Sequence, residues 1–365
     1  MATGLTVVVL LCAVVGGVGW YFAGLAIKVD RSTDLPLTIV HTGNGTVTLP
    51  RTTETSRPGT WALVWDGGRA ILGPVIGGDD LHVVREVSSV LEGSLDEDAA
   101  GAAAAIDHWI YDGDPGKALG LPFEDVAYPS RVGPMPAWLV PGTSRKSTWV
   151  IAVHGRNGDK AETLRVMRTV HEAGLPMLAI AYRNDVGAPP SGDRKNHLGY
   201  TEWEDLVSAM GYARAHGATG VVLYGWSMGG AMAMRTLRQD PSFVRGVVLD
   251  SPVLDWNATL DKQAAARNLP GIVTNVAKRV LEWRIGINLD DFDHRRYAPE
   301  LRTPVLLFTA ADDAMVANGP AHTFAATAPP GMVTHITTAG DHTESWNVDP
   351  AAYERVLRDF LQKVA

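Results

Sequence analysis

The stretch Val221-Val-Leu-Tyr-Gly-Trp-Ser-Met-Gly-Gly-Ala231 decides the fold of this chain. An apolar, β-branched run ends in Gly-Trp-Ser-Met-Gly, and a helix-favouring series follows at once. This pattern predicts a strand, a sharp turn and a helix, with Ser227 at the apex and its hydroxyl lifted off the sheet edge. Gly225 and Gly229 suit such a turn, because side chains there would collide with the neighbouring strand and helix.

Strand-like and helical segments alternate on both sides of this turn. The strand-like runs cover 148–153, 177–181, 221–224, 244–249, 305–309 and 333–337. Several are continuously apolar, as expected for a parallel sheet that helices cover on both faces. Residues 121–365 are therefore predicted to form a doubly wound, mostly parallel α/β domain. Helical segments at about 254–300 interrupt the alternation, and we expect them to form a lid over the strand ends.

The segment 31–120 has a different character. Short apolar runs at 37–41, 46–49, 60–65 and 70–75 are separated by turn signals, among them Asp66-Gly-Gly68. Such spacing is typical of short strands and hairpins. It predicts a small β-rich accessory region, to which no motif assigns any chemistry.

The amino-terminal segment is strongly apolar. Residues 5–27 include no charged side chain, and a helix of that length spans about 34 Å, enough to cross a bilayer. Trp20 and Tyr21 lie near one end, where aromatic rings prefer the membrane interface. A cleaved signal peptide is the competing interpretation, but it normally has a basic start, and residues 2–4 include no basic side chain. Residues 1–30 are therefore predicted to be a single-pass transmembrane anchor at the cell membrane, with the side of the catalytic domain left open.

Composition sets broad limits on function. The chain has 365 residues, of which 46% are hydrophobic and 20% are charged, as in a folded protein with a sizeable core. Its formal net charge is −8 and it has no Lys/Arg-rich run, so we expect no nucleic-acid partner. A single cysteine permits no internal disulfide. The oligomeric state is not indicated.

A serine hydroxyl needs a base to become a nucleophile, and that base needs an acid to orient it. His342 is the candidate base, in Ile336-Thr-Thr-Ala-Gly-Asp-His-Thr-Glu-Ser-Trp346. It follows a predicted strand and a glycine, and precedes the carboxyl-terminal helix. A loop in that position can hold an imidazole over the strand ends.

The acid has three candidates. Val305-Leu-Leu-Phe-Thr-Ala-Ala-Asp-Asp-Ala-Met-Val316 reads as a buried strand that runs into a loop with two adjacent aspartates. Asp313 is our choice and Asp312 competes with it, because adjacent side chains cannot both point at one imidazole. Asp250, which ends an earlier strand, is the third option.

An oxyanion hole needs backbone N–H groups aimed at the developing negative charge. One is expected from Met228, at the start of the predicted helix, and the other from Arg156 or Asn157 in the His-Gly-Arg-Asn turn after strand 148–153. We interpret His154 in that turn as a structural brace. Trp226, inside the nucleophile turn, is predicted to line a pocket for the substrate's acyl group.

Taken in order, His154-Gly155, the Gly225–Gly229 turn, the Asp313 loop and Gly340-Asp-His342 resemble the α/β-hydrolase superfamily, in particular its serine esterases and acyl-peptidase-like members. The resemblance covers about residues 123–363. It implies a mostly parallel eight-stranded sheet, a Ser-His-acid triad, no metal and no cofactor. One departure is Thr309-Ala-Ala, which stands where the family often has His-Gly.

The predicted function is a serine hydrolase that cleaves a small-molecule carboxylic ester through Ser227, His342 and Asp313. A peptidase, a thioesterase or an acyltransferase would use the same triad. A binding module on a catalytically dead hydrolase scaffold is the alternative from a different class.

Overall fold

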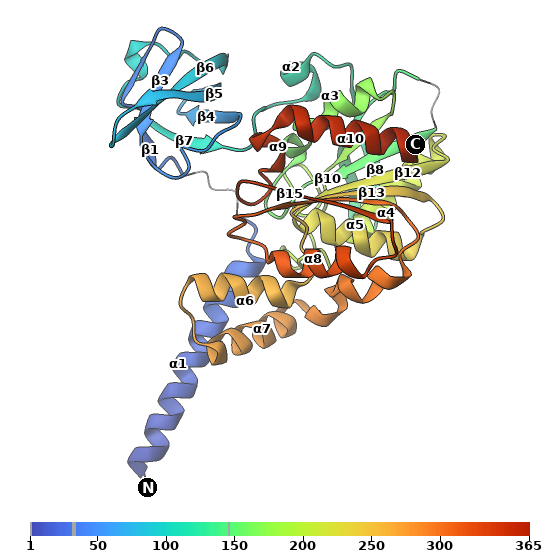
Figure 1. Ribbon diagram of the computed structural model, residues 1–365. Coiled ribbons are helices and arrows are strands. Elements are labelled where there is room, and N and C mark those ends of the chain that lie inside the picture. The colour runs from blue at the N-terminus through green and yellow to red at the C-terminus, as the bar shows by residue number, and fades with distance from the viewer. Residues whose placement is uncertain (1, 31–33, 145–146) are drawn as a thin grey trace.

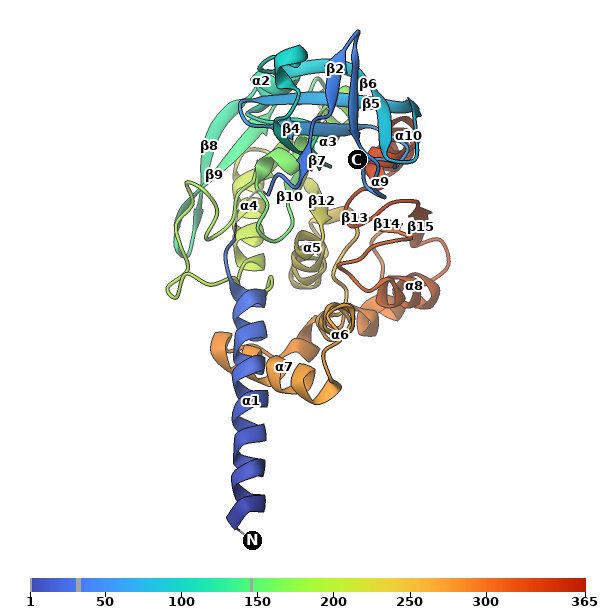
Figure 2. The same cartoon turned by 90° about the vertical axis from the view of Figure 1, so that its left-hand side faces the viewer.

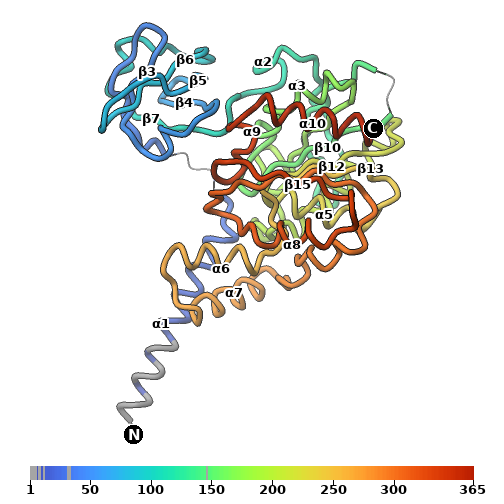
Figure 3. The backbone as a smooth tube through the Cα atoms, viewed as in Figure 1, coloured from blue at the N-terminus to red at the C-terminus, as the bar shows by residue number. Residues whose placement is uncertain are grey.

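The computed structural model describes residues 2–30, 34–144 and 147–365, so the first three residues of the predicted accessory region lie outside it. Three parts are visible in Figure 1: a helix α1 (Ala2–Ile27), a small antiparallel sheet, and a larger α/β domain. Figure 3 traces the backbone from the small sheet through α2 (Pro115–Leu119) into the α/β domain.

The α/β domain is built on a sheet of eight strands. They are β8 (Glu124–Ser130), β9 (Gly133–Val140), β10 (Thr148–Val153), β11 (Met177–Ile180), β12 (Gly220–Trp226), β13 (Val244–Asp250), β14 (Val305–Ala310) and β15 (Val333–Thr338). Their spatial order is β15-β14-β13-β12-β10-β11-β9-β8. Strands β10 to β15 pair in parallel, whereas β8 and β9 form an antiparallel hairpin along β11. The prediction of a mostly parallel α/β sheet is confirmed.

Helices cover both faces of this sheet. Successive residues of β10 point to opposite faces, since side chains alternate along a strand. Ile151 packs in a core with α4 (Trp203–Ala215) and α5 (Met228–Gln239). Val150 packs on the other face with α3 (Leu164–Glu172) and α10 (Pro350–Val364). All residues of β10, β12 and β14 are buried, which explains why their sequences are continuously apolar.

Shorter elements complete the α/β domain. The insertion predicted after β13 contains α6 (Trp256–Ala266), α7 (Gly271–Ile285) and the 3-10 helices η3 (Leu289–Phe292) and η4 (His294–Glu300). The remaining elements are η2 (Lys160–Thr163), α8 (Asn318–Thr327) and α9 (Ser345–Val348). The base candidate His342 therefore lies in the loop between β15 and α9.

The accessory region is an antiparallel sheet of seven strands. They are β1 (Leu37–Thr38), β2 (His41–Gly43), β3 (Thr46–Pro50), β4 (Trp61–Trp65), β5 (Gly68–Gly78), β6 (His82–Glu92) and β7 (Ala103–Asp107), with η1 (Glu97–Ala99) before β7. As the Asp-Gly-Gly signal predicts, β4 and β5 form a hairpin in which Trp65 pairs with Gly68. Trp61 and Leu63 are buried in a core that this sheet builds for itself.

The prediction of a transmembrane anchor at the cell membrane is wrong. Within residues 2–30, 34–144 and 147–365, no helix is long and apolar enough to cross a bilayer. The apolar residues at the end of α1 serve packing instead: Ala23 and Ile27 are 1% and 2% exposed in the core of the α/β domain. Trp20 lies 6.0 Å from Trp283 of α7, ring centre to ring centre. Figure 2 shows α7 crossing α1, and the two helices are in contact.

Packing of α1 against the α/β domain can be tested by side-chain truncation. We expect Ile27→Ala to lower the free energy of unfolding by about 2–5 kcal/mol, because it leaves a cavity in the shared core. Leu25→Ala is the matched control: Leu25 is 42% exposed, so its truncation should change stability by about 0.5 kcal/mol or less. Urea unfolding of both variants makes the comparison, and equal effects would contradict this account of α1.

Candidate active site

Ser227 stands at the turn between β12 and α5, as its sequence motif predicts. Its backbone dihedrals are φ 51° and ψ −116°, a conformation that a residue with a side chain rarely adopts. The crossing is tight: a Cβ on Gly225 would lie 2.4 Å from the backbone of Gly229, and a Cβ on Gly229 would lie 2.3 Å from the carbonyl oxygen of Val153. Glycine at both positions lets α5 leave the sheet immediately after the serine.

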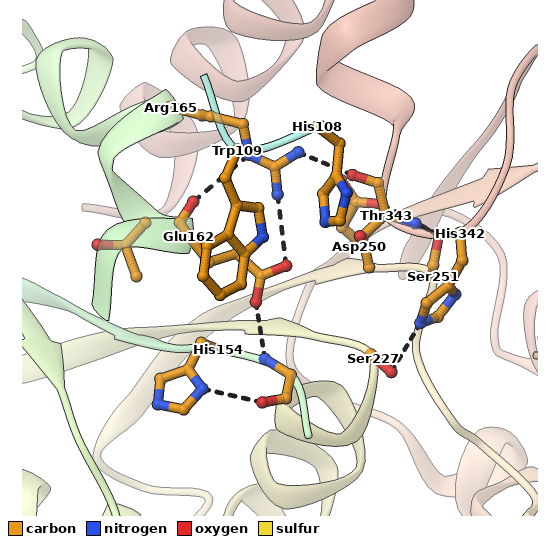
Figure 4. Close-up of polar contacts among 12 residues, drawn as sticks. His108, Trp109, His154, Glu162, Arg165, Ser227, Asp250, Ser251, His342 and Thr343 are labelled. Atoms are coloured by element: carbon orange, nitrogen blue, oxygen red, sulfur yellow. Dashed lines mark hydrogen bonds and ion pairs between the residues drawn. The ribbon is translucent and has the colours of Figure 1, made fainter. Parts of the chain in front are cut away.

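His342 reaches Ser227 from the loop after β15, which we call the base loop (residues 340–344). Its Nε2 lies 2.8 Å from Ser227 Oγ, the contact drawn in Figure 4. The next residue, Thr343, has φ 58°. Both of its backbone groups are engaged by side chains: its N–H donates to Ser251 Oγ at 3.1 Å, and its carbonyl accepts from Arg165 Nη1 at 2.8 Å. These contacts hold a strained turn in place directly beside the imidazole.

Asp313 is the carboxylate that meets the imidazole. Its Oδ2 lies 2.8 Å from His342 Nδ1, and its side chain is 0% exposed. Because a carboxylate only accepts hydrogen bonds, Nδ1 carries the proton and Nε2 is left to accept from the serine hydroxyl. The other oxygen of Asp313 accepts from the N–H groups of Met315 and Val316, at 2.9 and 2.7 Å, so the carboxylate is fixed on both sides.

The two competing aspartates lie elsewhere. Asp312 is exposed. Asp250 is buried and accepts a hydrogen bond from the hydroxyl of Tyr353 at 2.9 Å. Burial raises the pKa of Asp250 to about 6, whereas the carboxylate within 2.8 Å of the His342 imidazole is that of Asp313.

The predicted oxyanion donors lie on either side of Ser227. Met228 is the first residue of α5, where N–H groups have no partner within the helix and the helix dipole favours negative charge. The Gly155–Arg156 turn approaches from β10: a Cβ on Gly155 would lie 3.2 Å from the Ser227 Cβ. The N–H of Gly155 itself is donated to Glu162 Oε2 at 2.8 Å, which leaves the amides of Arg156 and Asn157 as the donors to consider from this turn.

His154 braces that turn. Its ring is fully buried and stacks on the ring of Tyr182. The Nδ1 atom lies 2.8 Å from the carbonyl oxygen of Gly155, and Nε2 lies 2.9 Å from Asp185 Oδ2. Both acceptors require an N–H, so the imidazole is doubly protonated. Burial alone lowers the pKa of His154, but the Asp185 carboxylate and the two hydrogen bonds outweigh it and raise the pKa.

Sequence reasoning missed a buried ion pair that contacts two loops of the candidate site. Glu162 and Arg165 are each 3% exposed, and their side chains approach to 3.4 Å. Glu162 accepts from Gly155 in the oxyanion turn, while Arg165 donates to Thr343 in the base loop (Figure 4). In the sequence the two residues read only as the start of an ordinary helix, because their partners are distant along the chain.

A cavity of about 130 Å³ is lined in part by Arg156, from the turn after β10, and by Met315, two residues after Asp313. Apolar side chains from α1, α6 and α7 line most of the rest, among them Phe22 of α1. Trp226 does not line it: that side chain is buried in the sheet's core, stacked on Tyr224 with ring centres 4.1 Å apart. The part of the chain that the structure describes has no group of three or more His, Cys, Asp or Glu placed to hold a metal ion.

Comparison with known proteins agrees with the α/β architecture. The model of the prolyl oligopeptidase family matches residues 191–354, and a domain of unknown function, DUF8805, matches residues 38–103. An esterase from Pyrococcus furiosus, Pf2001, superimposes with a TM-score of 0.56 at 20% sequence identity, over 70% of this chain and 95% of the esterase. The chain is an α/β hydrolase.

A second solved structure, DcsB in complex with its substrate analogue, gives a TM-score of 0.52 at 14% identity over 67% of this chain and 99% of that one. No curated protein matches this α/β hydrolase in sequence. The resemblance drawn from the sequence motifs is confirmed. The family match and the fold together support a serine hydrolase of carboxylesterase-like type.

The crowding at the serine turn can be tested at Gly229. We expect Gly229→Ala to destabilise the protein by about 3 kcal/mol or more, because the new methyl group would press on a backbone carbonyl that cannot move without disturbing β10. Gly211→Ala is the control: it is also helical, in α4, and a Cβ there meets nothing within 4 Å. That change should be neutral or stabilise by up to about 1 kcal/mol. Chemical denaturation of the two variants measures the difference.

Proposed function

We propose that this α/β hydrolase cleaves a carboxylic ester through Ser227, His342 and Asp313. One observation carries the proposal: a continuous chain of contacts runs from Ser227 Oγ to His342 Nε2 at 2.8 Å, and from His342 Nδ1 to Asp313 Oδ2 at 2.8 Å. That order of hydroxyl, imidazole and buried carboxylate is the arrangement that activates a serine for acyl transfer.

The reaction proceeds in two halves. Ser227 Oγ attacks the ester carbonyl carbon while its proton passes to His342 Nε2, and Asp313 stabilises the imidazolium that forms. The oxygen of the tetrahedral intermediate faces the N–H groups of Met228 and Arg156. Collapse expels the alcohol, which takes the proton from His342. Water then attacks the acyl-enzyme by the same route, releases the acid and restores the serine.

The cavity supports a substrate with a small apolar part. It lies next to Arg156, whose amide is the proposed oxyanion donor, and next to Met315, two residues after Asp313. A volume of about 130 Å³ is close to that of an apolar cavity of about 150 Å³ that holds benzene. A short acyl chain or an aryl group fits this space, and a long acyl chain does not.

A peptidase is the second candidate, because the family model that matches residues 191–354 is that of the prolyl oligopeptidase family. Amides and esters use the same triad, so the geometry around Ser227 favours neither. Parallel assays with p-nitrophenyl esters, a thioester and chromogenic peptides of one to four residues separate the two. Faster turnover of the peptides than of the esters would replace the ester proposal.

Removing the nucleophile is the direct test. Ser227→Ala should lower kcat/KM for p-nitrophenyl butyrate at least about 10³-fold, because the oxyanion hole and binding contacts alone provide only residual catalysis. Covalent labelling by a fluorophosphonate should disappear, while circular dichroism stays unchanged. Labelling that persists in the variant would show that Ser227 is not the nucleophile.

The cavity assignment predicts a change in acyl-chain preference. Phe22→Ala removes a ring from the α1 wall, so kcat/KM should shift from acetyl and butyryl towards hexanoyl and octanoyl esters of p-nitrophenol. Tyr21→Ala is the matched control, an aromatic truncation on the same helix at a residue that is 61% exposed. It should leave the chain-length profile as in the wild type. Identical profiles for all three proteins would place the acyl group outside this cavity.

A further inference from the structure

Arg57 reaches from the accessory sheet to the base loop. It lies between β3 and β4, and its guanidinium contacts two carboxylates of the α/β domain. Nη1 donates to Glu344 Oε1 at 2.5 Å, and Nη2 lies 3.5 Å from Asp341 Oδ2. Asp341 and Glu344 stand on either side of His342 in the chain. One arginine therefore contacts a residue before and a residue after His342, the residue that contacts Ser227.

The same two carboxylates hold the backbone around His342. Glu344 Oε2 accepts from the N–H of Asp341 at 2.6 Å. Asp341 Oδ1 accepts from the N–H of His342 at 2.7 Å and from the N–H of Ala314 at 2.6 Å. Ala314 follows Asp313 directly, so Asp341 ties the base loop to the loop that carries the acid. The orientation of these carboxylates therefore sets the relative position of His342 and Asp313.

Two neighbouring carboxylates need a counter-charge to share this site. Their side chains are only partly exposed, 27% for Asp341 and 10% for Glu344. Burial raises the pKa of Glu344, the hydrogen bond from the Asp341 N–H and the charge of Arg57 oppose that rise, and the charge of the Asp341 carboxylate adds to it. Without the guanidinium, repulsion would drive the carboxylates apart or protonate one of them, and either change loosens the backbone that they hold.

The accessory sheet presents Arg57 on a fixed segment. Arg85 of β6 is fully buried, and its guanidinium donates to the backbone carbonyls of Thr55, Arg57, Gly59 and Gly73. These bonds lock the loop on which Arg57 stands, so that the side chain approaches the base loop from a defined direction.

A second contact joins the same two parts of the molecule. Thr60 N–H donates to the carbonyl of Asn347 at 2.8 Å, and Asn347 Nδ2 donates back to the carbonyl of Thr60 at 3.0 Å. A Cβ on Gly59 would lie 2.3 Å from the Asn347 carbonyl oxygen, so the backbones are as close as glycine permits. Asn347 also accepts from Arg165, the buried arginine that holds Thr343.

We infer that the accessory sheet, which includes the domain of unknown function at residues 38–103, positions the base loop of the active site, with Arg57 as its positioning residue. Arg57 contacts no reacting atom and acts through Asp341 and Glu344. The inference rests on the proposed function, because it assigns the accessory sheet a role in catalysis by Ser227 and His342.

The test compares three full-length variants. Arg57→Gln should lower kcat for p-nitrophenyl butyrate, and the rate of fluorophosphonate labelling, by about 10- to 100-fold, since a displacement of about 1 Å in a catalytic group can cost 10²-fold. KM should stay within about twofold. Arg57→Lys keeps the charge and should recover at least part of the loss. Arg51→Gln is the matched control: Arg51 bonds the carbonyls of Asp79 and His82 within the accessory sheet, and its replacement should leave kcat within about twofold.

Thermal unfolding and a double-mutant cycle complete the experiment. The Tm of Arg57→Gln should match that of Arg51→Gln, and the losses caused by Arg57→Gln and Glu344→Gln should be non-additive, because the two residues act as one unit. A wild-type kcat in Arg57→Gln, or a loss that Arg51→Gln reproduces, would overturn the positioning role. A wild-type protein that neither turns over an ester nor reacts with the fluorophosphonate would instead overturn the proposed function.

Discussion

Three backbone segments meet at Ser227 with less space between them than side chains require. The end of β12, the start of α5 and the turn after β10 approach so closely that a single Cβ on Gly229 would lie 2.3 Å from the carbonyl of Val153. This crowding forces the φ of 51° at Ser227 and directs its hydroxyl away from the sheet. It also brings the Gly155–Arg156 turn beside the serine. One packing constraint therefore sets the positions of the proposed nucleophile and of its proposed oxyanion donors.

The other two members of the triad have no such rigid support. His342 and Asp313 stand on loops after β15 and β14, where the strands no longer dictate the backbone. Polar side chains supply the missing rigidity. Arg165 and Ser251 hold Thr343 at φ 58°, and Asp341 joins the two loops through their N–H groups. Hydrogen bonds from these side chains thus fix the loops of His342 and Asp313, whereas close backbone packing fixes Ser227.

Much of the fold and the core of the candidate site could be predicted from the sequence, because both leave local signals. Strands β10, β12 and β14 are buried along their whole length and therefore read as unbroken apolar runs. Ser227 and Asp313 follow such runs, and His342 follows the partly exposed strand β15 and a glycine, which is why the sequence could propose these three residues in order as nucleophile, acid and base. An apolar run does not reveal what it packs against, however. For that reason α1 read as a membrane anchor, whereas its last turns pack on the α/β domain, and Trp226 read as a pocket residue, whereas it belongs to the core.

Contacts between distant segments leave no signal of that kind. Arg57 and Glu344 are 287 residues apart, and Arg165 and Thr343 are 178 residues apart. In the sequence each of them is an ordinary charged or polar residue, and only the fold makes them neighbours.

Contacts between distant segments also determine which parts of this hydrolase surround the candidate site. The α/β domain contains the proposed triad, yet α1 supplies a wall of the cavity that Arg156 and Met315 also line, and the accessory sheet supplies Arg57 to the base loop. The segments that precede the α/β domain in the chain thus reach its active site from two directions, one on the substrate side and one on the side of the base. In the proposed function and the positioning role inferred for Arg57, both segments contribute to the surroundings of Ser227 and His342.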